Sequence, residues 1–134
     1  MKRAKYGNNK VRNRFGEFGS EGEYARFLFL QNRQKEGEIS GLKTQVEYEL
    51  IPAQYREETV QLKTKTKEVR RLVERPCTYK ADFEYWRGGK LIVEDYKGSK
   101  FMIDEKFPIK KKLMLYIHHI EVKVVTSPTF WDKD

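Results

Sequence analysis

A pair of alternating segments joined by two glycines places the strongest constraint on how this chain can fold. Residues 78–86 and 91–97 have the character of strands, and Gly88-Gly89 between them can adopt the positive φ angles of a tight turn. The sequence therefore predicts a β-hairpin, and we expect the other elements to pack around it.

Acidic side chains and a lysine are placed so that this hairpin can gather them. Successive side chains of a strand point to opposite faces, so Asp95 shares a face with Lys97, whereas Glu94 points the other way. The turn can bring Asp82 to the face of Asp95. Two carboxylates beside an ammonium group suit a hard cation, which can activate water against a phosphodiester. In a simpler interpretation, the aspartates are surface charges and Lys97 is their ion-pair partner.

The charge of the chain indicates a polyanionic partner. Its 134 residues suffice for one compact domain, and they carry a formal net charge of +8. Nucleic acid is the expected partner, although an anionic membrane surface or a basic surface that only aids solubility also fits this charge.

The sequence also predicts a cytoplasmic location. Cys77 is the only cysteine, which excludes an intrachain disulfide and suits a reducing compartment. No apolar run is long enough to span a membrane, and the N-terminus lacks the apolar core of a signal peptide.

Capping and periodicity predict two helices and a set of strands. Ser20 is a good N-cap with Glu23 at the capping-box spacing, which predicts a helix over residues 21–36. Pro108 suits the first turn of a second helix that ends at His118. Alternation predicts further strands over residues 43–50 and 120–125. The expected fold class is α/β, with a mixed central sheet flanked by helices.

The expected organisation is one domain with an arm, an insertion and a tail. The domain covers residues 15–126, after a flexible basic arm at 1–14 and before a tail at 127–134. A basic β insertion is expected near residues 54–75. Its lysines either straddle a DNA backbone or protect a solvated edge strand from pairing: Lys63, Lys65 and Lys67.

The hairpin motif resembles the signature of a known nuclease superfamily. Asp82, followed thirteen residues later by Asp95-Tyr96-Lys97, is similar to the Asp…(Asp/Glu)-x-Lys pattern of the PD-(D/E)XK nucleases. With Ser20 to Arg26 upstream, the wider pattern resembles small phage and prophage endonucleases described as Holliday-junction-resolvase-like. The resemblance covers roughly residues 15 to 125. Ala81 stands where the superfamily's name has proline, a position that is not a ligand.

This resemblance implies a fold, an activity and a site. The implied fold is a restriction-endonuclease-like αβββαβ core. The implied activity is metal-dependent DNA endonuclease, acting on branched DNA as a homodimer in phage recombination or replication within a bacterial host cell. It implies Mg²⁺, replaceable by Mn²⁺, on Asp82, Asp95 and the backbone carbonyl of Tyr96. Glu23 is implied as a further catalytic or metal-facing carboxylate, and Gln45 as a supporting residue.

Several basic residues are candidates for contacts with DNA, and other functions stay open. Arg26 either pairs with Glu23, reaches a phosphate or is simply solvated. The alternative functions are a non-cleaving nucleic-acid-binding module of the same fold and a nuclease that nicks or cuts linear DNA. The DNA-binding candidates are Arg26, Lys63, Lys65, Lys67, Lys100, Lys110 and Lys111.

Overall fold

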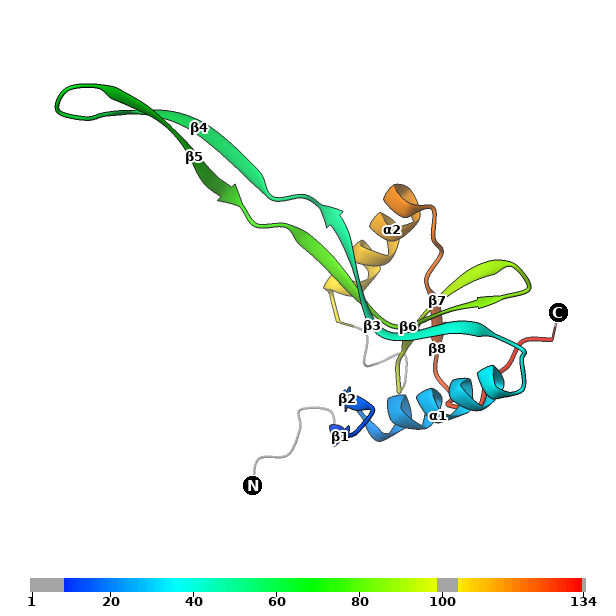
Figure 1. Cartoon of the computed structure of the whole chain (residues 1–134). Coiled ribbons are helices and arrows are strands. Elements are labelled where there is room, and N and C mark those ends of the chain that lie inside the picture. Colours follow the sequence, from blue (N-terminus) through cyan, green and yellow to red (C-terminus); the bar gives the residue numbers. More distant parts are fainter. Residues whose placement is uncertain (1–8, 99–103, 134) are drawn as a thin grey trace.

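The computed structural model of the protein describes residues 9–98 and 104–133. A four-stranded sheet forms its centre, in the order β3-β6-β7-β8 (Figure 1). β3 and β7 each pair antiparallel with β6, whereas β8 pairs parallel with β7. The prediction of an α/β fold with a mixed sheet is therefore confirmed. The strands are β3 (Ser40–Ile51), β6 (Cys77–Arg87), β7 (Lys90–Tyr96) and β8 (Lys123–Val125).

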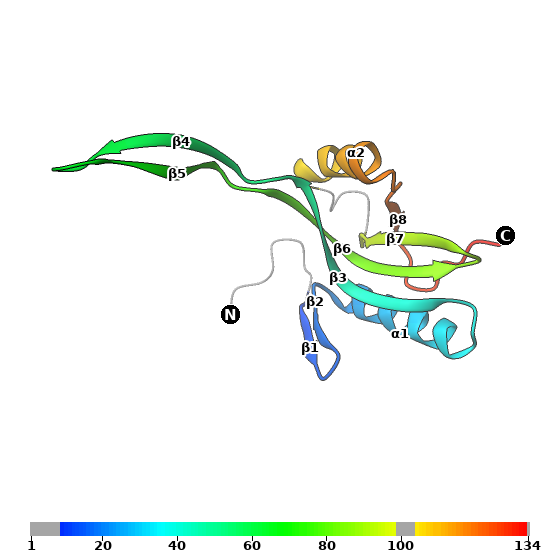
Figure 2. The same cartoon turned by 45° about the horizontal axis from the view of Figure 1, so that its top comes forward.

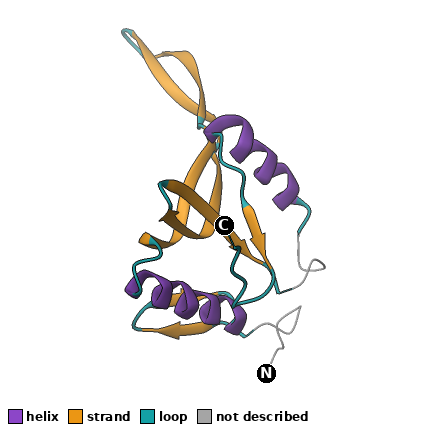
Figure 3. Cartoon of the chain, turned by 90° about the vertical axis from the view of Figure 1, so that its right-hand side faces the viewer, coloured by secondary structure: helices purple, strands orange, loops and turns teal. Residues whose placement is uncertain are grey.

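Two helices cover the sheet from opposite sides. α1 (Glu21–Lys35) lies below the strands in Figure 2 and α2 (Lys106–His118) lies above them, and Figure 3 shows the same layers from another side. Each helix packs on its own apolar cluster, with Phe27 and Leu30 of α1 in one and Phe107 and Met114 of α2 in the other. Neither helix is long and apolar enough to cross a membrane, nor is any other helix of the described residues.

The predicted hairpin forms the middle of the sheet. β6 and β7 pair around Gly88 and Gly89, whose φ angles are 57° and 77°. The predicted helix at 21–36 is also present, with Ser20 Oγ accepting a hydrogen bond from the backbone N–H of Glu23 at 3.1 Å. The core order α1-β3-β6-β7-α2-β8, with a ribbon inserted after β3, is the predicted one.

The segment predicted as a flexible basic arm is partly a hairpin. β1 (Val11–Asn13) pairs antiparallel with β2 (Gly16–Phe18), so residues 11–13 belong to an ordered element. Phe18 anchors this hairpin, because it is buried against Phe27 with ring centroids 5.1 Å apart. The other boundaries differ by a few residues: β3 is longer than predicted at both ends, and β8 starts only at Lys123.

The predicted basic insertion is a two-stranded ribbon that projects from the body (Figures 1 and 2). Among the residues that the structure describes, β4 (Gln54–Gln61) and β5 (Thr66–Glu74) pair only with each other. A turn at residues 62–65 separates β4 from β5. In that turn the N–H of Leu62 donates to the carbonyl of Lys65 at 2.7 Å.

Candidate active site

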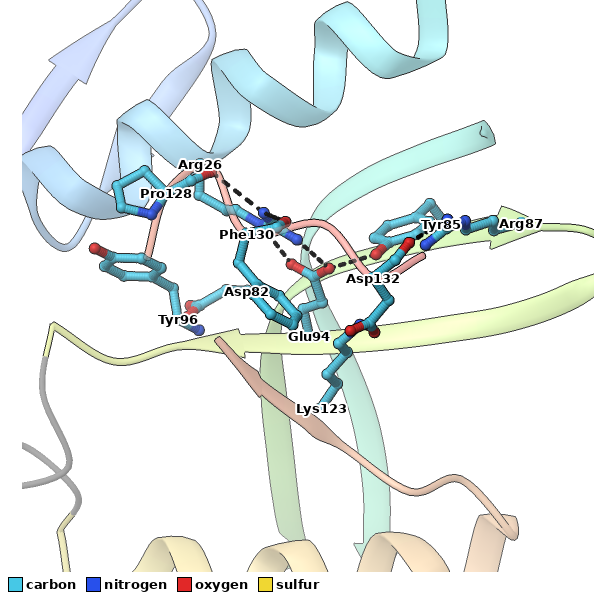
Figure 4. Close-up of polar contacts among 10 residues, drawn as sticks. All are labelled: Arg26, Asp82, Tyr85, Arg87, Glu94, Tyr96, Lys123, Pro128, Phe130 and Asp132. Atoms are coloured by element: carbon cyan, nitrogen blue, oxygen red, sulfur yellow. Dashed lines mark hydrogen bonds and ion pairs between the residues drawn. The ribbon is translucent and has the colours of Figure 1, made fainter. Parts of the chain in front are cut away.

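The predicted site residues come together where α1, β3, β6 and β7 meet. Phe83 pairs with Glu94, so the same register sets Asp82 opposite Asp95. Past the pair of Phe83 and Glu94, the two strands are linked by the backbone N–H of Tyr96, which donates to Asp82 Oδ2 at 2.7 Å. Figure 4 shows Asp82 beside Tyr96.

Glu23 reaches this place from the first turn of α1. Its Oε2 accepts hydrogen bonds from the backbone N–H of Gly19 and from Gln45 Nε2, both at 3.2 Å. Gly22 lets the helix approach β7, because a Cβ there would lie 2.5 Å from the Tyr96 hydroxyl. The capping-box position therefore serves two purposes: Glu23 caps its helix and also faces the strands.

Gln45 is turned toward Glu23 by an unusual backbone conformation. Its φ is 52°, a value that L-residues rarely adopt and that costs about 1–2 kcal/mol. The ladder between β3 and β6 pairs Thr44 with Phe83 and Val46 with Ala81, so Gln45 lies opposite Asp82. The strained residue thus sits at the candidate site, where backbone strain tends to concentrate.

β6 changes its packing partner at the same point. Tyr79 and Ala81 belong to the cluster under α2, whereas Phe83 and Tyr85 belong to the cluster over α1. Asp82 lies between them and is therefore close to both layers. Neither this crossing nor the conformation of Gln45 has a signal in the residue types.

Asp95 and Lys97 lie side by side, as the alternation predicted. Lys97 Nζ is 3.4 Å from Asp95 Oδ1 and 4.6 Å from the centre of the Phe107 ring. Tyr79 donates its hydroxyl proton to Asp95 Oδ2 at 2.7 Å. The backbone N–H of Lys97 donates to the Val125 carbonyl at 2.9 Å, so β8 fixes the lysine after β7 ends.

The charge of a neighbouring carboxylate raises the pKa of both Asp82 and Glu23. Burial raises the pKa of Asp82 from 3.8 to about 9, and the charges of Asp95 and Glu23 add to the effect. Burial also raises the pKa of Glu23, as does the charge of Asp95, against the opposing effect of hydrogen bonds and of Lys97. Carboxylates that share a buried site need either a proton or a cation to coexist.

The donor chemistry of this cluster fits a divalent cation. Carboxylate and carbonyl oxygens are the ligands that Mg²⁺ and Mn²⁺ prefer, and no thiol or imidazole is among these residues. Within residues 9–98 and 104–133, no three His, Cys, Asp or Glu side chains are already arranged around one metal position. One oxygen of each aspartate accepts a protein hydrogen bond, from Tyr96 N–H for Asp82 and from the Tyr79 hydroxyl for Asp95.

Two hollows of opposite charge flank the carboxylates. The one beside α1 measures about 570 Å³, and acidic side chains outnumber basic ones in its lining. The one beside α2 measures about 220 Å³, and lysines predominate in it. The α1-side hollow is lined by Lys10, Glu17, Gly19, Glu23, Gln45, Lys80 and Asp82. The α2-side hollow is lined by Tyr79, Lys80, Asp95, Lys97, Asp104, Lys106, Phe107 and Lys110.

Comparison with known proteins gives a family. A protein-family model described as "Protein of unknown function (DUF1064)" matches residues 3–130. The chain belongs to the DUF1064 family. Neither the curated proteins nor the solved structures contain a match. The family description assigns no activity, so the chemistry of this DUF1064 chain rests on its site.

The prediction that Arg26 contacts DNA is wrong, because its side chain is buried. Its side chain is 1% exposed and forms a two-pronged pair with Glu94, from Nε to Oε1 at 2.9 Å and from Nη2 to Oε2 at 2.7 Å (Figure 4). Tyr85 donates its hydroxyl proton to the same carboxylate. Arg26 Nη1 donates to the backbone carbonyls of Pro128 and Phe130. This DUF1064 chain uses Arg26 to join α1, β7 and the C-terminal segment.

The other predicted DNA-binding residues are spread over three places. Lys110 lines the hollow beside α2, but Lys111 lines a separate hollow with Pro108 and Leu115. Lys100 lies outside the described residues. Lys80 and Lys106, which sequence reasoning missed, also line the α2-side hollow. Lys63, Lys65 and Lys67 lie at the end of the β4–β5 ribbon, far from α1 along the chain.

Proposed function

We propose that this protein is a metal-dependent endonuclease that hydrolyses phosphodiester bonds in DNA. One observation carries the proposal: Glu23, Asp82, Asp95 and Lys97 come from α1, β6 and the end of β7 to one place, with the pKa of Asp82 strongly raised. The order α1-β3-β6-β7-α2-β8 supports the finer proposal of a restriction-endonuclease-like core, as the motif's resemblance to PD-(D/E)XK nucleases implies.

The acidic residues would hold the metal ion. Asp82, Asp95 and the backbone carbonyl of Tyr96 are the proposed ligands, with Glu23 as a further carboxylate. Mg²⁺ is the proposed cation, and Mn²⁺ is expected to replace it. When bound, such a cation lowers the pKa of water and neutralises charge on the phosphoryl oxygens. Gln45 and Tyr79 would orient Glu23 and Asp95 through the hydrogen bonds described above.

Lys97 would act on the charge that develops during hydrolysis. Its ammonium group lies 3.4 Å from Asp95 Oδ1, and only 18% of its side chain is exposed. A fixed ammonium group in such a site stabilises a negatively charged transition state more than the same group does in water. The ring of Phe107 beneath Nζ limits where the lysine can move.

The charge difference between the two hollows indicates on which side of the carboxylates the DNA strand would bind. The α1-side hollow contains Glu23 and Asp82, which favour a cation. The α2-side hollow contains Lys80, Lys106 and Lys110, which favour the phosphates next to the scissile bond. The DNA strand would therefore lie along the α2 side, with the scissile phosphate at Asp95 and Lys97.

Branched DNA and a homodimer are further parts of this proposal, and the resemblance of the motif supports them. Opposed cuts on two strands need two active sites, which a symmetric dimer provides. The mass of the protein in solution, measured by light scattering, tests the dimer. A monomer at the concentrations that cleave would overturn this part alone.

The test of function is cleavage of a labelled four-way junction and of a linear duplex with the same sequence. We expect cuts with Mg²⁺ or Mn²⁺, no cuts with EDTA, and none by Asp95→Asn or Lys97→Ala. Lys35→Ala, which removes an exposed lysine at the end of α1, is the matched control and is expected to cut normally. Asp95→Asn is expected to keep most of its DNA affinity.

The results separate the remaining possibilities. Cleavage by Asp95→Asn would refute the site. Tight binding without cuts in either metal would favour the non-cleaving module. Equal cutting of the junction and the linear duplex would refute branched DNA as the preferred substrate and favour a nuclease of linear or nicked DNA.

A further inference from the structure

The β4–β5 ribbon, residues 54–74, has the form of an interaction surface. It projects away from the sheet and both helices (Figures 1 and 2). Nearly all of its side chains are exposed, with Glu58, Val60 and Val69 half-buried. An isolated two-stranded hairpin is only marginally stable in water. A ribbon of this length therefore contributes little to the domain that carries it and calls for a function of its own.

Two prolines separate the ribbon from the sheet. Ile51 pairs with Cys77 at the end of β3 and β6, and Gln54 pairs with Glu74 at the start of the ribbon. Pro52 and Pro76 occupy the gap, opposite each other if the register of Ile51 and Cys77 continues. Because neither proline has an N–H to donate, the hydrogen-bond ladder stops in both strands at the same level.

Charges are compensated along the shaft of the ribbon. The carboxylate of Glu58 forms ion pairs with Arg56 Nη2 at 2.7 Å and with Arg71 Nε at 3.0 Å. The carboxylate of Glu57 lies 4.0 Å from Arg70 Nε. Thr59 donates its hydroxyl proton to Glu68 at 2.6 Å. The shaft is thus held together by its own ion pairs and hydrogen bonds.

Charges are uncompensated at the tip of the ribbon. Residues 62–67 contain Lys63, Lys65 and Lys67 and no acidic residue. Within the described part of the chain no ion pair involves any of these three lysines, and all three are exposed. Three exposed lysines within five residues, at the end of a projecting element, favour a polyanion.

The pairing register also gives the ribbon a basic face and an acidic face. Side chains of directly paired residues lie on the same face, and faces alternate along each strand. One face carries Arg56, Lys67 and Arg71 against the carboxylates of Glu58 and, at the base of the ribbon, Glu74. The other face has a carboxylate majority, with Glu57 and Glu68 against Arg70. The basic face is therefore the one that suits contact with phosphates.

We propose that the β4–β5 ribbon binds the backbone of duplex DNA at a distance from the scissile bond, with the tip lysines on phosphates. The inference rests on the proposed function for the identity of the partner, since the ribbon then holds the DNA that the site cuts. A major groove is wide enough to admit a two-stranded ribbon. A second copy of the chain fits less well, because each copy carries a net charge of +8 and the same lysine cluster.

The length of the ribbon sets the length of duplex that it needs. Sixteen residues separate Asp82 from Thr66 along β6 and β5, which span at most about 50 Å at about 3.3 Å per residue. At about 3.4 Å per base pair, the tip reaches phosphates no further than about 15 base pairs from the site. Shorter duplex flanks would leave the tip lysines without a partner.

The experiment compares DNA affinity as the duplex flank is lengthened. The variants are Lys63→Ala/Lys65→Ala/Lys67→Ala and a control that loses the same charge at the opposite end of the molecule (Figure 1). The control triple variant replaces Lys35 at the end of α1, Lys90 at the start of β7 and Lys133 near the C-terminus. All proteins carry Asp95→Asn so that the DNA stays intact. The probes are junctions with flanks of 6, 10, 15 and 25 base pairs, and affinity is measured by fluorescence anisotropy over a range of salt.

We expect the tip variant to bind the shortest flanks as tightly as its parent does. As the flanks lengthen, the affinity of the parent should rise and that of the tip variant should lag behind it, and the difference should stop growing beyond flanks of about 15 base pairs. On the long flanks the slope of log affinity against log salt should decrease by about 2 to 3, since each lost phosphate contact removes about 0.9. Normal affinity for short flanks also shows that the variant is folded.

Three results would overturn the proposal. The first is a loss of DNA affinity by the tip variant that is equal on short and long flanks, or an equal loss of affinity by the control variant. Either outcome would mean that only net charge matters. The second is unchanged affinity on every probe. The third is a change in oligomeric state with unchanged DNA affinity, which would make the ribbon a contact between copies. Because binding is read without cleavage, absence of nuclease activity in the parent would refute the proposed function without deciding the role of the ribbon.

Discussion

Asp82→Asn is expected to stabilise the metal-free protein while abolishing cleavage. Burial, together with the charges of Asp95 and Glu23, raises the pKa of Asp82 from 3.8 to about 9. At pH 7 the folded protein therefore keeps this carboxyl group protonated, whereas the unfolded chain ionises it. Asparagine retains an oxygen that can accept from Tyr96 N–H, and it carries no charge in either state.

The size of the effect follows from the proton that the folded state must retain. Holding it costs about 1.4 kcal/mol for each pH unit above the unfolded pKa. Between 3.8 and pH 7 this amounts to about 4 kcal/mol, which is the upper limit for the gain from asparagine. Because the folded pKa lies above the unfolded one, the gain is absent below pH 4, grows as the pH rises and levels off near pH 9.

The assay is urea unfolding of both proteins with EDTA at pH 4, 6, 7 and 8, followed by tryptophan fluorescence. Asp132→Asn, which removes an exposed carboxylate that pairs with Lys123, controls for loss of charge and should change stability little at any pH. Added Mg²⁺ should stabilise the wild-type protein and not Asp82→Asn. An Asp82→Asn protein that is no more stable than wild type at pH 8, or a gain of equal size at pH 4, would refute the reasoning.

Two further substitutions test the contacts around the site. Glu94→Ala leaves the guanidinium group of Arg26 buried without its partner and should destabilise the protein by about 3–5 kcal/mol in urea unfolding; a loss below 1 kcal/mol would contradict the buried pair. Gly22→Ala, at the start of α1, places a Cβ against the ring of Tyr96 and should therefore reduce cleavage more than tenfold. The unfolding midpoint should stay close to that of wild type, because alanine stabilises the helix by about 1 kcal/mol relative to glycine and offsets the clash. Normal cleavage by Gly22→Ala would show that the spacing between α1 and β7 is not critical.

The sequence predicted the parts of this structure that depend on local signals. Ser20, the Gly88-Gly89 turn and the alternation of Asp95 with Lys97 are short-range features, and each leads to the element or juxtaposition expected. The ribbon was also predictable in outline, although the turn at residues 62–65 was not. Alternation survives through that turn in the residue types, so the pattern could not show where the chain reverses.

The sequence could not predict features that arise when distant segments meet. Arg26 follows Glu23 by one helical turn and has the composition of a surface residue, yet it is buried because Glu94 lies beneath α1. Nothing local to Arg26 shows that partner, which is 68 positions away. The positive φ of Gln45 also could not be predicted from the sequence, since glutamine has no preference for that conformation.

The adjacent acidic residues of β7 explain why the fold and the candidate site depend on each other. Glu94 and Asp95 point to opposite faces, so one strand offers a carboxylate to each side of the sheet. On the α1 side, Glu94 holds Arg26, and Arg26 lies on the same helix face as Glu23, three positions earlier. The buried pair therefore sets the distance between α1 and β7, and with it the distance from Glu23 to Asp95 across the sheet edge. The pair that holds the helix also holds Glu23 near Asp82 and Asp95, which a surface ion pair of about 0–1 kcal/mol would not do.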